Sequence, residues 1–166
     1  MRLGRRILSR VSWLALTVWP MAASGQSTSV VPDVANSRAL GTTATQAGAF
    51  VTIDGGTRAG NNLFDSFWQF NLSAGDTARW VRGAGDGSSI SNVISRVTGG
   101  QTSLISGTLD STALPNASFF FINPAGIVFG AGARVNGPAA AYFSTAGEFR
   151  FADATRFAVS APNGST

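Results

Sequence analysis

A segment near the end of the chain, residues 117–136, constrains the fold more than any other part of the sequence. An apolar run at 119–122 enters the four residues Asn123-Pro124-Ala125-Gly126, and a second apolar run at 127–129 follows. Proline at the second position of a turn fixes φ, asparagine at the first position can bond the backbone, and glycine suits the last position. These residues therefore predict a strand, a tight turn and a second strand.

Short apolar runs recur along most of the chain, separated by glycine, serine, threonine and asparagine. No long segment has the spacing of an amphipathic helix, so we expect an all-β protein. Residues 26–35 read as a polar arm that leads into the first strands. The expected strands are residues 49–53, 63–72, 78–81, 90–97, 104–105, 107–109, 119–122, 127–129, 133–136, 140–144, 148–152 and 156–160. From Ile90 onward the runs recur at loosely similar intervals, which leaves a parallel β-helix and a β-sandwich equally open.

The distribution of charge argues against a nucleic-acid partner. The formal net charge is +4, and all 12 basic side chains are arginines. Arg2, Arg5, Arg6 and Arg10 lie in the first ten residues, and without them the remaining arginines balance the 8 acidic residues. Nucleic-acid binding rests on clustered positive charge, so we expect no such partner.

The first 25 residues have the pattern of a secretory signal peptide. Arginines open the chain, an apolar run at 11–19 follows that is too short to span a bilayer, and small residues at 22–25 come next. We expect cleavage between Ala23 and Gln26. No later apolar run is long enough for a membrane span, so we expect an exported or soluble chain without stable membrane insertion.

The absence of cysteine and histidine narrows the possible chemistry. It excludes disulfides and both Ser-His-Asp and Cys-His catalysis, and it removes the commonest metal ligand. The acidic residues are seven scattered aspartates and Glu148, and nothing in their spacing favours a paired-carboxylate site. We expect no enzymatic activity, no metal and no cofactor.

Three segments together carry a family resemblance. The Asn-Pro-Ala-Gly turn resembles the Asn-Pro-Asn-Gly segment of the filamentous haemagglutinin N-terminal domain, which is the secretion domain of two-partner secretion exoproteins. Residues 55–72 are similar to the early Gly-rich, Leu-Phe and Gln-Phe-Asn block of that family, and residues 90–109 to its middle block. The resemblance covers about 34–161. It implies a right-handed parallel β-helix with N-terminal capping strands and small antiparallel extensions, over a domain at 26–166.

The resemblance also marks candidate site residues. They are the turn residues Asn123, Pro124, Ala125 and Gly126, and the early-block residues Asn62, Leu63, Phe64, Ser66, Phe67, Gln69, Phe70 and Asn71. For the turn, both a structural role and direct recognition by a transporter remain open. Alternation along the strand places Phe120 opposite its neighbours. We expect the aromatic residues at 64–70 to pack under a capping strand rather than to form a ligand platform. Asn71 begins either a turn or an inward asparagine ladder.

The chain departs from the family pattern in three places. Ala125 stands where the family most often has asparagine, and Asp65 replaces a commonly seen histidine. Family members usually continue into a long β-helical stalk, whereas this sequence ends at Thr166. We therefore expect a truncated product or a fragment, with a bare C-terminal edge that makes it marginally stable or self-associating.

The resemblance implies a function in export. Such chains cross the inner membrane by a signal peptide. A cognate outer-membrane β-barrel transporter then recognises them in the periplasm through its POTRA domains, and they fold outside, on the cell surface or in the medium. Full-length members are adhesins, haemagglutinins, haemolysins or contact-dependent toxins, so a host-surface or carbohydrate ligand would belong to a passenger region missing here.

Two other functions remain as alternatives. A carbohydrate- or receptor-binding adhesin module would present exposed aromatic side chains such as Trp68 and Trp80 to its ligand. A β-helical polysaccharide lyase would need aspartate and arginine side chains clustered in a groove. The available side chains for that site are Asp110, Asp153, Arg134 and Arg150.

Overall fold

Every regular element in the computed structural model is a β-strand within the residues that it describes, 25–34, 39–81 and 90–160. The strands are β1 (Ser29–Pro32), β2 (Thr43–Ala47), β3 (Phe50–Asp54), β4 (Thr57–Ala59), β5 (Asn62–Asn71), β6 (Thr77–Trp80), β7 (Asn92–Val97), β8 (Ser103–Ile105), β9 (Thr108–Asp110), β10 (Ser118–Ile122), β11 (Ile127–Phe129), β12 (Arg134–Asn136), β13 (Ala140–Ser144), β14 (Glu148–Arg150) and β15 (Arg156–Ala158). No helix of membrane-crossing length and hydropathy occurs in these ranges.

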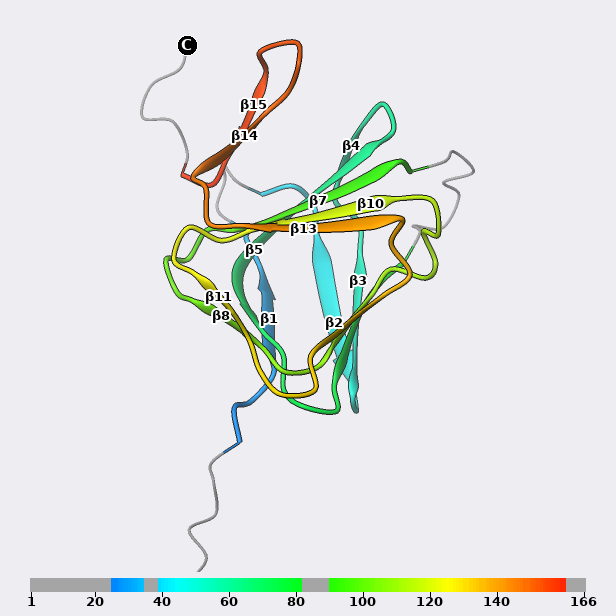
Figure 1. Ribbon diagram of the computed structural model, residues 1–166, viewed down its shortest axis with the longest axis vertical. Helices are drawn as coiled ribbons and strands as arrows, with labels where there is room; N and C mark the ends of the chain where they lie inside the picture. The colour runs from blue at the N-terminus through cyan, green and yellow to red at the C-terminus, as the bar shows by residue number, and fades with distance from the viewer. Residues whose placement is uncertain (1–24, 35–38, 82–89, 161–166) are drawn as a thin grey trace, which may run out of the picture.

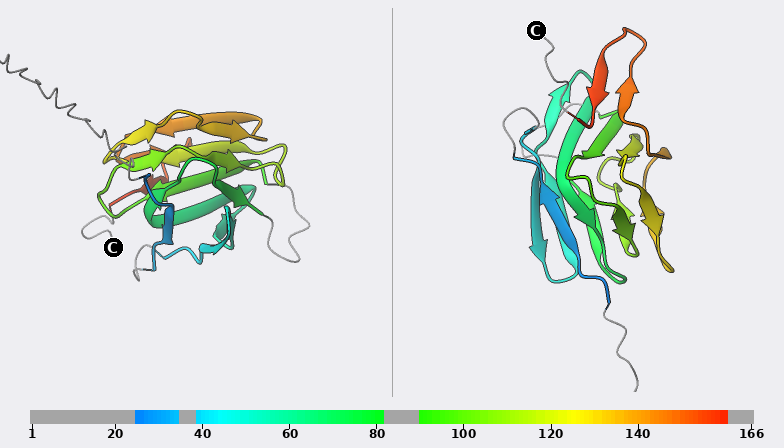
Figure 2. Two further views of the ribbon diagram at one scale, coloured as in Figure 1. Left: turned by 90° about the horizontal axis from the view of Figure 1, so that it is seen from below. Right: turned by 90° about the vertical axis from the view of Figure 1, so that its left-hand side faces the viewer.

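The strands wind into a parallel β-helix of about three turns, whose cross-section is three-sided in Figure 1. One face stacks β5, β7, β10 and β13 in parallel, a second stacks β3, β6, β9 and β12, and the third pairs β8 with β11. Figure 2 shows the coils lying over one another as successive layers. The register is regular, since Asn62, Asn92, Ser118 and Ala140 stand one above another on the first face.

Antiparallel strands cover the N-terminal end of the helix. β2 pairs antiparallel with β3, while β1 and β4 pair antiparallel with two parts of β5. Glycines with positive φ at Gly55 and Gly56 turn the chain between β3 and β4, a conformation that residues with a Cβ rarely adopt. We call β2 and β3, with the residues from Thr42 that lead into them, the N-terminal cap.

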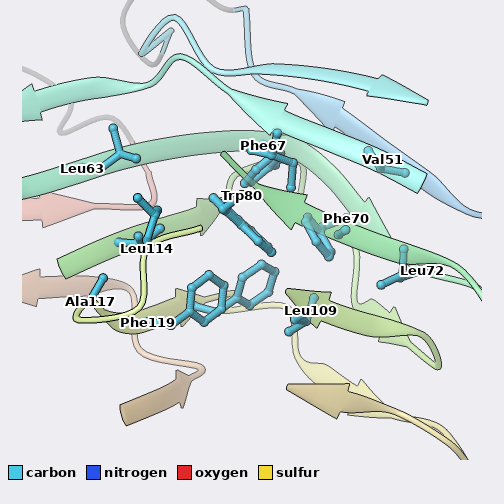
Figure 3. Close-up of a cluster of buried hydrophobic side chains, with 14 of the residues drawn as sticks. Val51, Leu63, Phe67, Phe70, Leu72, Trp80, Leu109, Leu114, Ala117 and Phe119 are labelled. Atoms are coloured by element: carbon cyan, nitrogen blue, oxygen red, sulfur yellow. The ribbon is translucent and has the colours of Figure 1, made fainter. Parts of the chain in front are cut away.

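The interior is apolar because alternate side chains of each parallel strand point inward. Phe119 and Phe121 are buried while Phe120 between them is partly exposed, which confirms the predicted alternation. The inward side chains form one continuous core, part of which Figure 3 shows. At its centre Trp80 lies edge-on to Phe119, with ring centroids 4.7 Å apart, and stacks on Phe70.

A β-hairpin of β14 and β15 packs on the outer face of the first sheet. Phe157 lies against Phe64 at 4.9 Å between ring centroids, and Phe149 lies against Phe120 at 5.0 Å. Arg96 fastens the hairpin, because its guanidinium lies over the Phe157 ring and donates a hydrogen bond to the carbonyl of Ala158. This outward aromatic cluster covers apolar side chains that would otherwise face solvent.

The fold confirms the prediction of a β-helix with N-terminal capping strands and antiparallel extensions, and it resolves the choice against a sandwich. The strands at 127–129 and 140–144 have their predicted bounds, and the other predicted strands differ mainly at their ends. The sequence did not indicate β2 or β4, and β1 lies inside the segment taken as a polar arm. The expected marginal stability or self-association stays a prediction.

Close backbone approach at one corner gives a test of the coil packing. A Cβ on Gly107 would lie 2.2 Å from the carbonyl oxygen of Asp76 and 2.5 Å from that of Ser73, in the preceding coil. We expect Gly107→Ala to lower the free energy of unfolding by about 1–3 kcal/mol, since backbone must move. Urea denaturation measures this. Gly147→Ala is the matched control, because no atom lies within 4 Å of the added Cβ; equal effects of the two changes would contradict the model of tight coil stacking.

Candidate functional site

The Asn-Pro-Ala-Gly turn forms a corner of the third coil, between β10 and β11. The amide N–H of Gly126 donates to the carbonyl of Asn123 at 3.0 Å, and Gly126 has a φ of 117°. The Asn123 side-chain oxygen accepts from the N–H of Ala125 at 3.0 Å. The predicted tight turn, with asparagine bonded to the backbone, is therefore present.

The side chain of Asn123 also joins successive coils. Its Nδ2 donates to the carbonyl of Gln101 and to the hydroxyl of Ser103, each at 2.9 Å, on the coil below. Its backbone N–H donates to the carbonyl of Ser144 at 3.0 Å, on the strand above. Asn123 is 0% exposed, so in the folded protein its amide is used entirely within the fold.

The exposed part of the turn consists of Pro124 and Ala125. A pocket of about 250 Å³ lies beside them. Its lining residues are Val97, Thr98, Gly100, Asn123, Pro124, Ala125, Gly147, Val159 and Ser160, all uncharged. The turn therefore offers a small, uncharged surface to solvent, while the asparagine that defines it is hidden.

The early-block residues all lie on β5, where they stack the first coil against its neighbours. Leu63, Phe67 and Phe70 are buried in the core, and Phe64 faces the hairpin, so packing explains these apolar side chains as predicted. The polar side chains of the block contact neighbouring strands: Asn62 accepts from Asn92 at 2.7 Å, Ser66 from Arg96 at 3.0 Å, Gln69 from Ser29 at 3.3 Å, and Asn71 from the N–H of Leu104 at 2.9 Å.

These contacts place the early block within the scaffold. The Asn62–Asn92 pair is a two-residue asparagine ladder, whereas Asn71, for which a ladder or a turn was expected, bonds the backbone of the next coil. The block contacts the strand that leads into the turn within the core, where Phe70 packs against Phe121 of β10 at 5.0 Å between ring centroids. They do not form one surface site.

Sequence reasoning missed the importance of Asp65, which is 1% exposed inside the first coil. Its carboxylate oxygens accept hydrogen bonds from the hydroxyl of Thr42 and from the indole N–H of Trp80, each at 3.1 Å. Burial raises the pKa of Asp65 to about 7, against the lowering effect of these two hydrogen bonds and with a smaller raising effect from Asp54. The available signal was an acidic residue at an inward position between the apolar residues Leu63 and Phe67.

Three of the four residues considered for a lyase have separate partners, and Arg134 lies on β12. Asp110 pairs with Arg79 at 3.2 Å, Arg150 pairs with Glu148 at 2.5 Å, and Asp153 accepts from Thr155 in the hairpin turn. Partial burial raises the pKa of Asp110, but hydrogen bonds from Thr112 and the Arg79 guanidinium hold it below its ordinary value. Within the described residues no three metal-ligating side chains gather.

The two tryptophans named for an adhesin site differ in exposure. Trp80 is 1% exposed, so the expectation that it would be available to a ligand is wrong, because the ring fills the centre of the core. Trp68 is 48% exposed, so the expectation that all aromatic residues at 64–70 pack under a capping strand is wrong for this residue. It lines a hollow of about 340 Å³ with Val31, Pro32, Asp33 and Val34.

The buried amide of Asn123 gives a stability prediction. Asn123→Ala leaves the carbonyl of Gln101, the hydroxyl of Ser103 and the N–H of Ala125 without this partner, so we expect the free energy of unfolding to fall by about 1–3 kcal/mol. Urea denaturation is the measurement. Pro124→Ala, at the neighbouring exposed position, serves as the control and should change stability by less than about 1 kcal/mol. A smaller loss for Asn123→Ala than for the control would show that the three bonds contribute nothing.

Comparison with known proteins places this fold and turn in a family. The model of the TPS secretion domain matches residues 32–166. A solved structure, the HMW1 secretion domain from Haemophilus influenzae, is 25% identical, with a TM-score of 0.48 over 73% of this chain and 27% of its own. No curated protein sequence matches. The family match extends over every described coil, and the chain therefore belongs to the TPS secretion domain family.

Proposed function

We propose that this chain is recognised in the periplasm by a cognate outer-membrane β-barrel transporter, through the POTRA domains of that transporter, and is thereby exported. The observation that carries the proposal is the match of the TPS secretion domain to residues 32–166. Domains of this family act in two-partner secretion, in which an exoprotein and an outer-membrane transporter work together. We further propose that residues 1–25 are the signal peptide, that 26–166 form the secretion domain, and that the exoprotein is of the adhesin or haemagglutinin type.

The burial of Asn123 limits when the turn can be recognised. Its amide bonds Gln101, Ser103 and Ala125 once the second and third coils stack, so a partner can bind that amide only before stacking. Pro124 and Ala125 stay accessible afterwards. A partner would therefore bind the asparagine in the unfolded chain in the periplasm. In the folded domain the same asparagine stabilises the stacking of the coils.

Strand addition is a physical mechanism for the recognition step. Before folding, β-forming segments present unpaired N–H and C=O groups, and a transporter domain with an open sheet edge can pair with them. Apolar side chains such as Phe119 and Phe121 are then available to pockets on the transporter. Folding outside the cell buries those side chains and so favours forward movement of the chain.

Coexpression with the transporter tests the export function. We expect the chain to reach the medium with the transporter present and to stay in the periplasm without it, as measured by immunoblotting of both fractions. Retention in the periplasm despite a transporter that exports its own full-length partner would overturn the proposal.

A matched pair of variants tests the turn itself. Ala125 and Ala131 are both exposed alanines in turns of the third coil, so Ala125→Asp and Ala131→Asp add the same charge at comparable positions. If the transporter reads the Asn-Pro-Ala-Gly turn, Ala125→Asp should lower release about tenfold, equivalent to about 1.4 kcal/mol of binding, while Ala131→Asp leaves it unchanged. Equal release of both variants, with equal stability, would assign the turn to the scaffold alone.

A second candidate function rests on the exposure of Trp68. Its ring lines the hollow with Val31 and Val34, and aromatic side chains of this kind bind apolar faces of sugars or receptor side chains. Surface binding through this hollow requires that Trp68→Ala abolish binding to a glycan panel while leaving transporter-dependent release intact. An unchanged binding profile would remove this candidate.

A further inference from the structure

We propose that Asp65 is a proton-controlled latch, which fastens the N-terminal cap to the first coil while its carboxyl group is neutral and loosens the cap when that group ionises. The inference is independent of the proposed export function. It rests on the position of one buried carboxyl group at the junction of several elements, where it forms no ion pair with the described residues.

The carboxyl group joins the cap to the coil through a short chain of hydrogen bonds. The hydroxyl of Thr42, in the cap, donates to Asp65 Oδ1 at 3.1 Å and accepts from the backbone N–H of Ser66 at 3.1 Å. The other carboxyl oxygen, Oδ2, accepts from Trp80 on β6. Gly56 closes the site from the β3–β4 connection, where an added Cβ would lie 2.8 Å from Oδ1. Besides the pairing of β3 with β6, the cap is thus joined to β5 through the Thr42 hydroxyl, which bonds both Asp65 and the Ser66 amide.

Among the described residues, the charged groups on the surrounding elements do not compensate a negative charge at this position. The negative charge of Asp54 on β3 opposes ionisation of Asp65. Arg58 on β4 donates to the carbonyl of Gly60, and Arg79 on β6 pairs with Asp110. On β7, Arg96 donates to Ser66 Oγ and lies over Phe157.

Asp33, which follows β1, also lies near the site, since its backbone N–H donates to the carbonyl of Ser66 at 2.9 Å, and its carboxyl group accepts a hydrogen bond from Thr98. Ser95, the register partner of Asp65 on β7, has a buried hydroxyl without a hydrogen-bond partner in the described part of the chain. The site therefore offers a carboxylate two hydrogen-bond donors but no cation among the described residues, and burial in an apolar interior favours the neutral carboxyl group over the carboxylate.

The direction of the pH effect follows from linkage. Because the pKa of Asp65 lies at about 7 in the folded chain and near 3.8 when unfolded, folding takes up a proton between these values. The unfolding equilibrium therefore shifts toward the unfolded state by up to about tenfold per pH unit across that window, and it levels off above pH 7. The stabilisation is fully present below the lower value and lost as the pH rises through the upper one.

Hydrogen exchange and denaturation of the purified chain between pH 5 and 9 test the latch. The Ser66 amide, which bonds Thr42, should lose protection on the alkaline side before the amides of β10 do. Asp65→Asn keeps the shape of the side chain and removes its titration, so its stability should not fall between pH 5 and 8. The intrinsic rate of amide exchange rises with pH. Comparing the wild type with this variant at the same pH removes that effect. Asp110→Asn is the control and should keep the wild-type slope, since the Asp110 pKa lies below this range.

Two results would overturn the latch. One is an equal pH dependence of wild type and Asp65→Asn; the other is simultaneous loss of protection at Ser66 and throughout β10, which would make Asp65 a global determinant and not a latch. If Asp65→Asn does not fold, carbon-13 NMR of the aspartate carboxyl groups in the wild type decides. A midpoint near 7 for Asp65 supports the proposal, and a midpoint near 4 refutes it.

Discussion

In-register stacking of parallel strands is the constraint on which the rest of this structure depends. Each coil hydrogen-bonds the coil before it, so an error at one corner would displace every strand that follows. The corners fix the register by two means. Asn123 fills one corner with side-chain hydrogen bonds to the coil below, and Gly107 allows the backbones of two coils to approach closely at another. Both means need a particular residue, whereas the strands between them need only alternating apolar side chains.

The division between strands and corners explains how much the sequence could predict. The strands at 127–129 and 140–144 are bounded by turn residues, so local chemistry was sufficient to place them. β2 is mostly exposed and polar, and it is a strand because β3 offers it a partner. Such a strand depends on tertiary pairing, which a pattern along one segment does not reveal. For the same reason periodicity could not separate a β-helix from a sandwich.

The candidate site was predictable in chemistry but not in exposure. The Asn-Pro-Ala-Gly turn was located from its residues, yet only the three-dimensional contacts show that Asn123 is hidden and that Pro124 and Ala125 remain outside. Asp65 is the opposite case. An acidic residue in a β-strand is expected to lie at the surface until its neighbours in the fold are known. Its environment combines Thr42 from before β2, Gly56 from before β4 and Trp80 from β6, three places that no local pattern connects.

The hairpin of β14 and β15 changes the way in which a stack of coils can come apart. In a simple solenoid each repeat touches only its neighbours, so the end repeats can fray one at a time. Here one hairpin contacts Phe64 on the first coil, Arg96 on the second and Phe120 on the third. The hairpin therefore connects the three coils along the outside of the stack. Coils that are not adjacent are linked directly through it, as well as through the coils between them. Loss of the last coil is thereby coupled to loss of the first, so the three coils that the hairpin joins come apart together, while the N-terminal cap can open separately from them.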